Sequence, residues 1–335
     1  MVRRRPALLG LAALAAGLLV PLAPAGAGTA DDAVPRFDRV FLIVGENTSL
    51  SQLDSNDAPY QLGTLKPRSA WFSDYWGISH YSTSNYIAMT WGKFTACDQA
   101  DEKPATCHHP GTDNLFSEMN AAGVGWKAWN ESMPGSCWLV NSGKSADQNS
   151  YRPKHNPAAY FDDIVGVTSG TQGTGASCLA NDVSMSVDAA HAATPNDTGA
   201  FDAALQSGSV PRFNMIVPNM CEDGHDNCAP TGNPIRQFDG FLAREIPNIM
   251  RSSAWTPGSV IVVVYDEGQD GGPGKAVKFA GGNVPFLVLG GSVHAATYSQ
   301  TANHYSLLRT LEDGLGIPTH ANNAATASTL GDIWN

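Results

Sequence analysis

The sequence is poor in positive charge and, after residue 27, contains no long apolar run. Its 335 residues include 20 Lys and Arg against 31 Asp and Glu, a formal net charge of −11. So acidic a chain attracts neither nucleic acid nor an anionic membrane, which argues against both as tightly held partners. A membrane-spanning helix needs about 20 consecutive apolar residues, and we therefore expect no stable membrane insertion. A single phosphorylated head group entering a cationic pocket stays compatible with this charge.

The first 27 residues have the three parts of a secretory signal peptide. These are arginines at 3–5, an apolar stretch from Ala7 to Leu22, and the small residues Ala25-Gly26-Ala27 at the expected cleavage point. Cleavage would leave 31 acidic and 17 basic residues, a net charge of −14. We expect a secreted protein with a single domain over residues 28–335, a length that suits one large α/β domain.

The six cysteines of an exported chain favour disulfides over zinc ligands. Several connectivities are possible, and the simplest hypothesis joins cysteines that are close in sequence: Cys97 with Cys107, Cys221 with Cys228, and then Cys137 with Cys178. A bridge between Cys221 and Cys228 would hold the loop that carries His225 and Asp226. Such a bridge makes sense beside a site, because a loose loop positions its side chains poorly.

Polar side chains follow three apolar runs that have the pattern of buried strands. Val260–Tyr265 is followed by Asp266-Glu267-Gly268, Val40–Gly45 by Glu46-Asn47-Thr48-Ser49, and Phe213–Val217 by a polar loop over residues 218–226. In open α/β sheets, ligands bind beyond the carboxyl ends of the strands. Adjacent carboxylates are costly to ionise side by side unless a cation holds them. Although each loop alone is also typical of a solvated turn, together they predict a shared polar, metal-binding site.

Further patterns predict the rest of the fold. Strands are expected over Val124–Trp129 and Val284–Leu289, and helices over Arg236–Arg251 and from His304 onward. Pro247 would kink the first helix or end it early. The Gly-, Ser- and Thr-rich stretch 166–199 is expected to be irregular. Alternating strands and helices predict an α/β fold with a mostly parallel sheet covered on both faces.

A candidate nucleophile lies in the segment from His80 to Gly92. Its apolar spacing predicts a helix that begins near Ser84, and a hydroxyl at a helix N-terminus suits a phosphate oxyanion. An ordinary N-cap is the alternative, because serine is a preferred capping residue. The hydroxyls of Ser82, Thr83 and Ser84 all lie near this expected start. His108 and His109, in the small cysteine loop, are expected on the surface.

Six segments taken in order resemble the bacterial phosphoesterase family: Glu46-Asn47-Thr48-Ser49, His80-x-Ser82-x-x-Asn85-Tyr86, His155-Asn156-Pro157, Pro218-Asn219 with His225-Asp226, Asp266-Glu267-Gly268, and His304 to Thr310. That family includes secreted acid phosphatases and phosphatidylcholine-type phospholipases C. The resemblance implies an alkaline-phosphatase-like three-layer sandwich with a mostly parallel central sheet. It extends from Val40 to Asp313, nearly the whole mature chain.

The resemblance also implies roles for the matched residues. Ser82 would be the nucleophile that forms a phosphoenzyme. Divalent-cation ligands would be Glu46, Asn47, Asp266 and Glu267. His155 and His225 would bind phosphate or act as acid and base, and the residues at the substrate would be Asn85, Asp226 and His304.

We therefore expect a secreted, metal-assisted phosphomonoesterase, closest to short acid phosphatases that act on phosphatidylinositol 3-phosphate. The expected partner is a phosphate monoester, with a phosphoinositide head group as one candidate. A phospholipase C-like phosphodiesterase is the first alternative. An exported binding protein that keeps the fold without turnover is the second.

Overall fold

The computed structural model describes residues 1–2, 34–270 and 280–335. The expected signal peptide therefore lies almost entirely outside the described residues. No helix in the described ranges is both long and apolar enough to cross a membrane.

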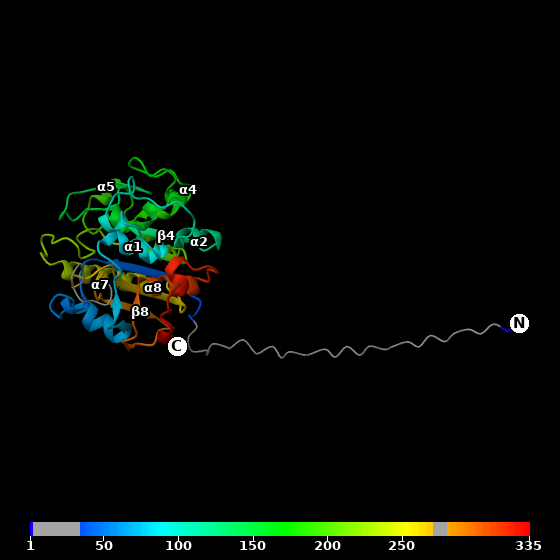
Figure 1. The fold of residues 1–335 in the computed structure, drawn as a ribbon. Helices are drawn as coiled ribbons and strands as arrows, with labels where there is room; N and C mark the ends of the chain where they lie inside the picture. Colours follow the sequence, from blue (N-terminus) through cyan, green and yellow to red (C-terminus); the bar gives the residue numbers. More distant parts are fainter. Residues whose placement is uncertain (3–33, 271–279) are drawn as a thin grey trace.

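An eight-stranded sheet with the order β5-β4-β6-β1-β7-β8-β2-β9 forms the centre of the fold (Figure 1). Its strands are β1 Arg39–Gly45, β2 Ala70–Phe72, β4 Trp126–Asn130, β5 Asp182–Ser184, β6 Phe213–Val217, β7 Ser259–Tyr265, β8 Phe286–Gly290 and β9 Ala296–Tyr298. Only β8 runs antiparallel to its neighbours, β7 and β2. The expected mostly parallel sheet is thus confirmed. A small second sheet pairs β3 Tyr75–Trp76 with β10 Ala302–Asn303.

The three central strands bring their polar exits to one edge of the sheet. β1 lies between β6 and β7 and is parallel to both, with Gly45 beside Tyr265 and Ile43 beside Ile216. All residues of β6 and β7 are buried, as their mainly apolar sequences predict for strands covered on both faces. Because parallel strands end at the same edge, the loops that follow residues 45, 217 and 265 begin side by side.

Helices flank the sheet: α1 Ser82–Trp91, α2 Leu115–Ala121, α3 Asp162–Val165, α4 Ala176–Asn181, α5 Ala189–Ala192, α6 Gly199–Ser207, α7 Pro234–Arg251 and α8 His304–Leu315. α1 packs against α8 and α2, and Figure 1 shows α1 and α2 together on one side of β1. Short 3₁₀ segments such as Pro153–His155 lie in the connections.

Two expectations about this architecture need correction. α7 continues through Pro247 to Arg251, so Pro247 does not end the helix. The 166–199 stretch is not wholly irregular, because it forms α4, β5 and α5, and β5 pairs with β4 at one end of the sheet. Its Gly- and Ser-rich composition hid these short elements, of which β5 is stabilised by pairing with β4 rather than by its own propensity.

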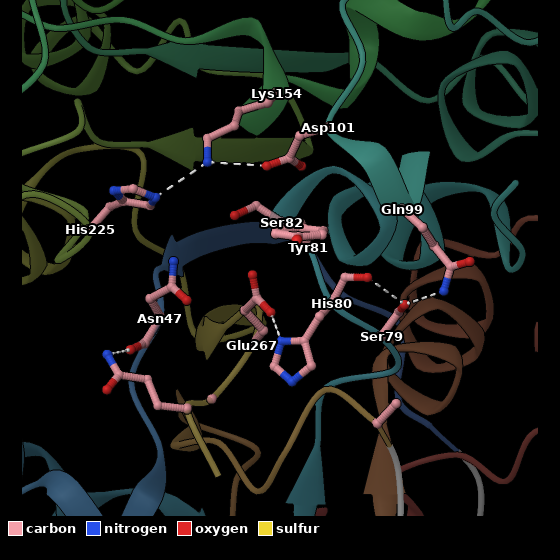
Figure 2. Close-up of a pocket in the computed structure, with 13 residues that line it drawn as sticks. Asn47, Ser79, His80, Tyr81, Ser82, Gln99, Asp101, Lys154, His225 and Glu267 are labelled. Atoms are coloured by element: carbon pink, nitrogen blue, oxygen red, sulfur yellow. Dashed lines mark hydrogen bonds and ion pairs between the residues drawn. The ribbon is translucent and has the colours of Figure 1, made fainter. Parts of the chain in front are cut away.

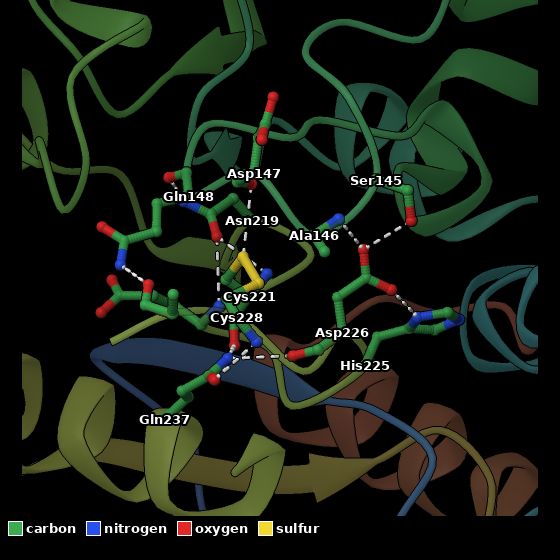
Figure 3. The surroundings of a disulfide bond; sticks show 12 residues. Ser145, Ala146, Asp147, Gln148, Asn219, Cys221, His225, Asp226, Cys228 and Gln237 are labelled. Carbon is green, nitrogen blue, oxygen red and sulfur yellow. Dashed lines mark hydrogen bonds and ion pairs between the residues drawn. A yellow bond between two sulfur atoms is a disulfide. The ribbon is translucent and has the colours of Figure 1, made fainter. Parts of the chain in front are cut away.

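The disulfides join Cys97 to Cys107, Cys137 to Cys178 and Cys221 to Cys228, which confirms the hypothesis of local pairing. Figure 3 shows the Cys221–Cys228 bridge beside the turn that carries His225 and Asp226. The surface position expected for His109 is wrong, since its ring is buried with Nε2 2.9 Å from Asp98 Oδ1.

A buried carboxyl of α8 faces a second carboxyl of α2. Glu312 is fully buried, and its Oε1 accepts a hydrogen bond from the Ala321 N–H at 2.8 Å. Burial raises the pKa of Glu312 to about 9, and the charge of the neighbouring Glu118 adds to the effect. The folded protein therefore holds a proton that the unfolded chain releases at about pH 4 to 5.

This proton predicts that stability falls as pH rises. A group whose pKa is raised in the folded state makes its full contribution to stability below its unfolded pKa. As pH rises from the unfolded to the folded pKa, this contribution is lost by at most about 1.4 kcal/mol per pH unit. Glu312→Gln keeps an acceptor for Ala321 and does not titrate. Its melting temperature should therefore fall less than that of wild type between about pH 5 and about pH 8, a range that lies between the unfolded and folded pKa values of Glu312. Calorimetry checks this against Glu102→Gln, which alters an exposed carboxylate. Equal slopes in wild type and Glu312→Gln would contradict it.

Candidate active site

A cavity of 680 Å³ opens at the sheet edge where the central strands end. Figure 2 shows its wall, which combines the β1 exit, the segment before α1, and residues after β6 and β7. The side chains that line it include Asn47, His80, Ser82, Asp101, Lys154, His225 and Glu267. Five residues selected from the sequence thus meet at one place. Four of them line the cavity, namely Asn47, Ser82, His225 and Glu267, and Glu46 joins them through its contact with Ser82.

Ser82 is the hydroxyl of the α1 N-terminus that lines this cavity. The helix begins at Ser82, two residues earlier than expected, and the Ser82 hydroxyl donates to Glu46 Oε2 at 3.0 Å. The other two hydroxyls are turned elsewhere: Thr83 donates to Asp101 Oδ1 at 2.8 Å and Ser84 to the Tyr81 carbonyl at 2.6 Å. The Thr83 N–H also donates to Asp101, so this N–H of the first turn is not directed at a phosphate.

Asn85 holds the loop before α1 rather than facing the cavity. Its Oδ1 accepts hydrogen bonds from the N–H groups of Ile78 and Ser79, and its Nδ2 donates to the carbonyls of Ser79 and Tyr81. With both ends of the amide engaged in a fully buried position, Asn85 has no group left for a phosphoryl oxygen. In this structure Asn85 therefore positions the His80–Ser82 segment, and its contact with substrate stays a prediction.

Three buried carboxyls and a buried imidazole gather behind Ser82. His155 Nε2 lies 3.2 Å from Glu46 Oε1, and His155 Nδ1 lies 3.0 Å from Asp223 Oδ2. These approaches lack hydrogen-bond geometry, because Glu46 Oε1, Asp223 Oδ2 and His155 Nε2 all have no hydrogen-bond partner. Asp266 Oδ2 is also buried without one.

The electrostatics of this cluster are unfavourable without a counter-charge. Burial raises the pKa of Glu46 well above its usual range, with Asp266 and Asp223 adding to the effect. Burial likewise raises the pKa of Asp266, where Glu267 contributes next, and that of Asp223. The pKa of His155 is lowered well below its usual value by burial and then by Lys154. The imidazole is therefore neutral and offers a lone pair.

These observations fit a divalent cation. Glu46, His155 and Asp223 each offer a ligand atom, and these atoms lie within 4.8 Å of one another. Buried carboxylate oxygens and an imidazole nitrogen without hydrogen-bond partners are donors that suit a hard or borderline metal ion. Of the four expected ligands, Glu46 belongs to this group, and Asp266 lies near enough for its charge to raise the pKa of Glu46.

The other two expected ligands, Asn47 and Glu267, line the cavity instead. Asn47 adopts a left-handed conformation with φ of 47°, which asparagine tolerates better than most residues. Its N–H donates to Asp266 Oδ1 at 3.2 Å, so this turn positions Asp266. Glu267 is paired with His80 Nδ1, which makes it the link between the β7 exit and the segment before Ser82.

A basic pair lies opposite the carboxylates. Lys154 Nζ is 3.2 Å from His225 Nε2 and 3.4 Å from Asp101 Oδ2 (Figure 2). Because an ammonium only donates, His225 accepts at Nε2 and its Nδ1–H donates to Asp226 Oδ1 at 2.8 Å. Burial alone would lower the pKa of Lys154, but Glu46, Asp101, Asp266 and Asp223 together raise it. Lys154 therefore stays cationic beside the cavity.

Three further candidate residues make contacts that differ from the expected ones. His155 does not line the cavity, so it is a candidate cation ligand rather than a phosphate contact. Asp226 accepts from His225, Ser145 and Ala146. Burial alone would raise the pKa of Asp226, but these hydrogen bonds lower it to about 2, and this anion orients His225.

His304 is the third of these. It is fully buried, with Nε2 2.6 Å from the Asp266 carbonyl and Nδ1 3.2 Å from the Tyr75 hydroxyl. Burial lowers the pKa of His304 to about 4. The neutral ring therefore supports the backbone of Asp266 and does not reach the substrate.

Sequence reasoning missed Asp223, Lys154 and His80. Each adjoins a recognised segment: Asp223 lies in the loop after β6, Lys154 precedes His155, and His80 opens the segment that contains Ser82. A basic residue beside a site in so acidic a chain was a usable signal for Lys154. Nothing in the sequence separates Asp223 from its acidic neighbour Glu222.

Solved structures with similar folds show which fold this chain has. A protein of the alkaline phosphatase superfamily from Vibrio parahaemolyticus matches with a TM-score of 0.57 at 12% identity, over 87% of this chain and 70% of that chain. Phosphonate monoester hydrolase of Agrobacterium radiobacter matches with a TM-score of 0.54 at 12% identity, over 88% and 76%. The fold is therefore that of the alkaline-phosphatase superfamily, as the sequence predicts.

The chain belongs to the phosphoesterase family, whose model matches residues 34–318. It is 26% identical over 310 residues to the phosphatidylinositol-3-phosphatase of Mycobacterium tuberculosis, covering 92% of this chain and 86% of that protein. It is 25% identical over 288 residues to a phosphate-repressible acid phosphatase of Penicillium chrysogenum, covering 84% of this chain and 60% of that protein. The protein is accordingly a hydrolase of phosphoric esters.

Proposed function

We propose that this protein is a secreted acid phosphatase that hydrolyses phosphate monoesters through a phosphoserine at Ser82, within a single catalytic domain over residues 28–335. The observation that carries the proposal is the position of the Ser82 hydroxyl. It lines the cavity, donates to Glu46 Oε2 at 3.0 Å, and shares that cavity with Lys154 and His225. A nucleophile, an acceptor for its proton, a cationic donor for a phosphate and an imidazole are thereby brought together.

The side chains divide the reaction between them. The Ser82 oxygen attacks phosphorus while its proton moves toward Glu46, and the bond from phosphorus to the leaving oxygen breaks. Lys154 binds a phosphoryl oxygen as a fixed cation. His225 is oriented by Asp226 and, in its imidazolium form, donates the Nε2 proton to the leaving oxygen. The neutral ring then takes a proton from the water that hydrolyses the phosphoserine. The Penicillium chrysogenum relative is named an acid phosphatase, which supports the same class for this chain.

The same proposal includes a divalent cation at the carboxylate cluster. Glu46, Asp223, Asp266 and His155 would hold it, with Asn47 and Glu267 nearby on the cavity wall. A bound cation there would favour the serine alkoxide and neutralise charge on the phosphoryl group. The buried carboxyls outnumber Lys154, the cation beside them, so a bound divalent cation would balance their charge.

The substrate class is a phosphate monoester, with phosphatidylinositol 3-phosphate as a candidate through the mycobacterial relative. A monoester dianion has one more charged oxygen than a diester, and Lys154 and His225 suit that oxygen. Each charge-assisted contact contributes about 1.5–3 kcal/mol, so two would favour the monoester by more than about a hundredfold.

We predict that kcat/KM for p-nitrophenyl phosphate exceeds that for p-nitrophenyl phosphorylcholine. Lys154→Met should shrink the preference by at least about tenfold, since it removes one charged contact, and His225→Ala should shrink it as well. Lys144→Met is the matched control, because Lys144 is exposed ten residues away in sequence and does not line the cavity.

The assay also separates the alternatives. Faster hydrolysis of the diester would replace the monoesterase by a phospholipase C-like enzyme. If the metal-loaded protein releases phosphate from no phosphoester, a binding protein of the same fold is the better account.

A further inference from the structure

A second cavity of 300 Å³ adjoins the first. The two share Asp101, Lys154 and His225 as lining residues. Beyond this common wall, the second cavity is lined by Lys103, Arg152, Ser145, Asn141, Tyr160 and Met220, among others. A molecule whose phosphate reaches Ser82 past Lys154 and His225 therefore has a further, mainly polar space beside it.

This second cavity concentrates positive charge in an acidic chain. Three cationic side chains line it, Lys103, Arg152 and Lys154, although the whole chain has a net charge of −11. Its two carboxylates are already engaged. Asp101 accepts from Thr83 and pairs with Lys154, and the Asp226 carboxylate accepts from His225, Ser145 and Ala146.

Two of the cations retain donors for a ligand. Arg152 is anchored by Nη1, which donates to the carbonyls of Ser142 and Tyr151 at 2.8 Å. Its Nε and Nη2 make no hydrogen bond within the part of the chain that the structure describes, and neither does Lys103 Nζ. A guanidinium with a fixed stem and free N–H groups is well suited to a phosphate or carboxylate.

We propose that the second cavity binds a second anionic group of the substrate, so that the preferred substrates are phosphate monoesters carrying a further phosphate or carboxylate. This inference rests on the proposed monoesterase function. The reacting phosphate would occupy the first cavity at Ser82, and the second anion would contact Arg152 and Lys103. Phosphatidylinositol 3-phosphate fits the pattern, because its inositol ring carries a monoester and also a phosphodiester.

The test compares three substrates: inositol 3-phosphate, inositol 1,3-bisphosphate and phosphatidylinositol 3-phosphate in mixed micelles. A contact present in both ground and transition states lowers KM and leaves kcat unchanged. The KM for the soluble bisphosphate should therefore be about tenfold lower than for the monophosphate, the effect of one charge-assisted contact. A preference for the lipid without one for the soluble bisphosphate would overturn the inference, because recognition would then lie in the lipid.

Variants locate the effect. Lys103→Ala should raise KM for the bisphosphate by about three- to tenfold, because an exposed cation is partly screened, and should leave KM for the monophosphate unchanged. Arg152→Met should do the same. The Lys103 side chain is exposed and makes no hydrogen bond or ion pair among the described residues, so this variant keeps the test valid if the loss of the Arg152 anchors unfolds the protein.

Lys144→Ala is the matched control, since it removes the same charge from a neighbouring exposed position outside both cavities. An equal effect of Lys144→Ala would mean general electrostatic attraction and would overturn the subsite. If wild type hydrolyses none of the three substrates nor p-nitrophenyl phosphate, the proposed function itself fails. If it hydrolyses all without preference, only the second subsite fails.

Discussion

Replacing Ser82 by Ala is expected to reduce phosphate release from p-nitrophenyl phosphate by at least about a thousandfold, because loss of the nucleophile removes the covalent route. The fold should be retained. Ser82 is buried at the first position of α1, where its hydroxyl contributes one hydrogen bond, to Glu46 Oε2. Steady-state kinetics and a thermal melt of the same preparation measure both effects.

Ser84→Ala is the matched control for this substitution. Ser84 lies on the same first turn, but its hydroxyl donates to the Tyr81 carbonyl and it does not line the cavity. Its kcat/KM should stay within about tenfold of wild type, as expected for a group that contacts no substrate. A fully active Ser82→Ala, or an inactive Ser84→Ala that folds normally, would move the nucleophile away from Ser82.

Replacing Asp266 by Asn is expected to remove both the cation and the activity while leaving the protein folded. Asp266 is fully buried, its Oδ2 has no hydrogen-bond partner, and its neighbours Glu46 and Glu267 carry like charges. Neutralising one member of a self-repelling cluster relieves repulsion in the metal-free state. Elemental analysis after dialysis, with a phosphatase assay on the same sample, gives the metal content and the activity.

Chelation provides an independent readout of the same site. The wild-type melting temperature should fall when a chelator removes the cation, because a ligand that binds only the folded state stabilises it. The melting temperature of Asp266→Asn should not respond to the chelator. Glu102→Gln, at an exposed carboxylate, should behave as wild type. Full metal content and activity in Asp266→Asn would exclude the cluster as the cation site.

The parts of the fold that could be predicted are those set by local patterns. Dense Val and Ile runs specified β1, β6 and β7, and the rule that parallel strands share an edge brought their polar exits together. The start of α8 at His304 followed from its leucine spacing. The short elements α4, β5 and α5 could not be found in this way, because pairing and packing rather than sequence preference stabilise them.

Site residues were harder to predict where their role depends on distant contacts. The spacing from Ser82 to Asn85 puts both on one helix face, yet Asn85 turns to the loop over residues 78–81. His304 occupies a recognised segment, but the packing of α8 buries it behind Asp266. Asp223 and Lys154 belong to two connections that are far apart in the sequence and lie together only in the folded chain. Their proximity therefore could not be predicted from spacing within the sequence.

The central claim, a phosphoserine at Ser82, is tested most directly by trapping the intermediate. The metal-loaded enzyme is mixed with p-nitrophenyl phosphate, quenched in acid within one turnover, digested and analysed by peptide mass spectrometry. The account predicts a phosphate on Ser82 in the peptide that spans the start of α1, absent in Ser82→Ala and unchanged in Ser84→Ala. A phosphate on His225 or on another residue, or an active enzyme that never carries one on Ser82, would contradict it.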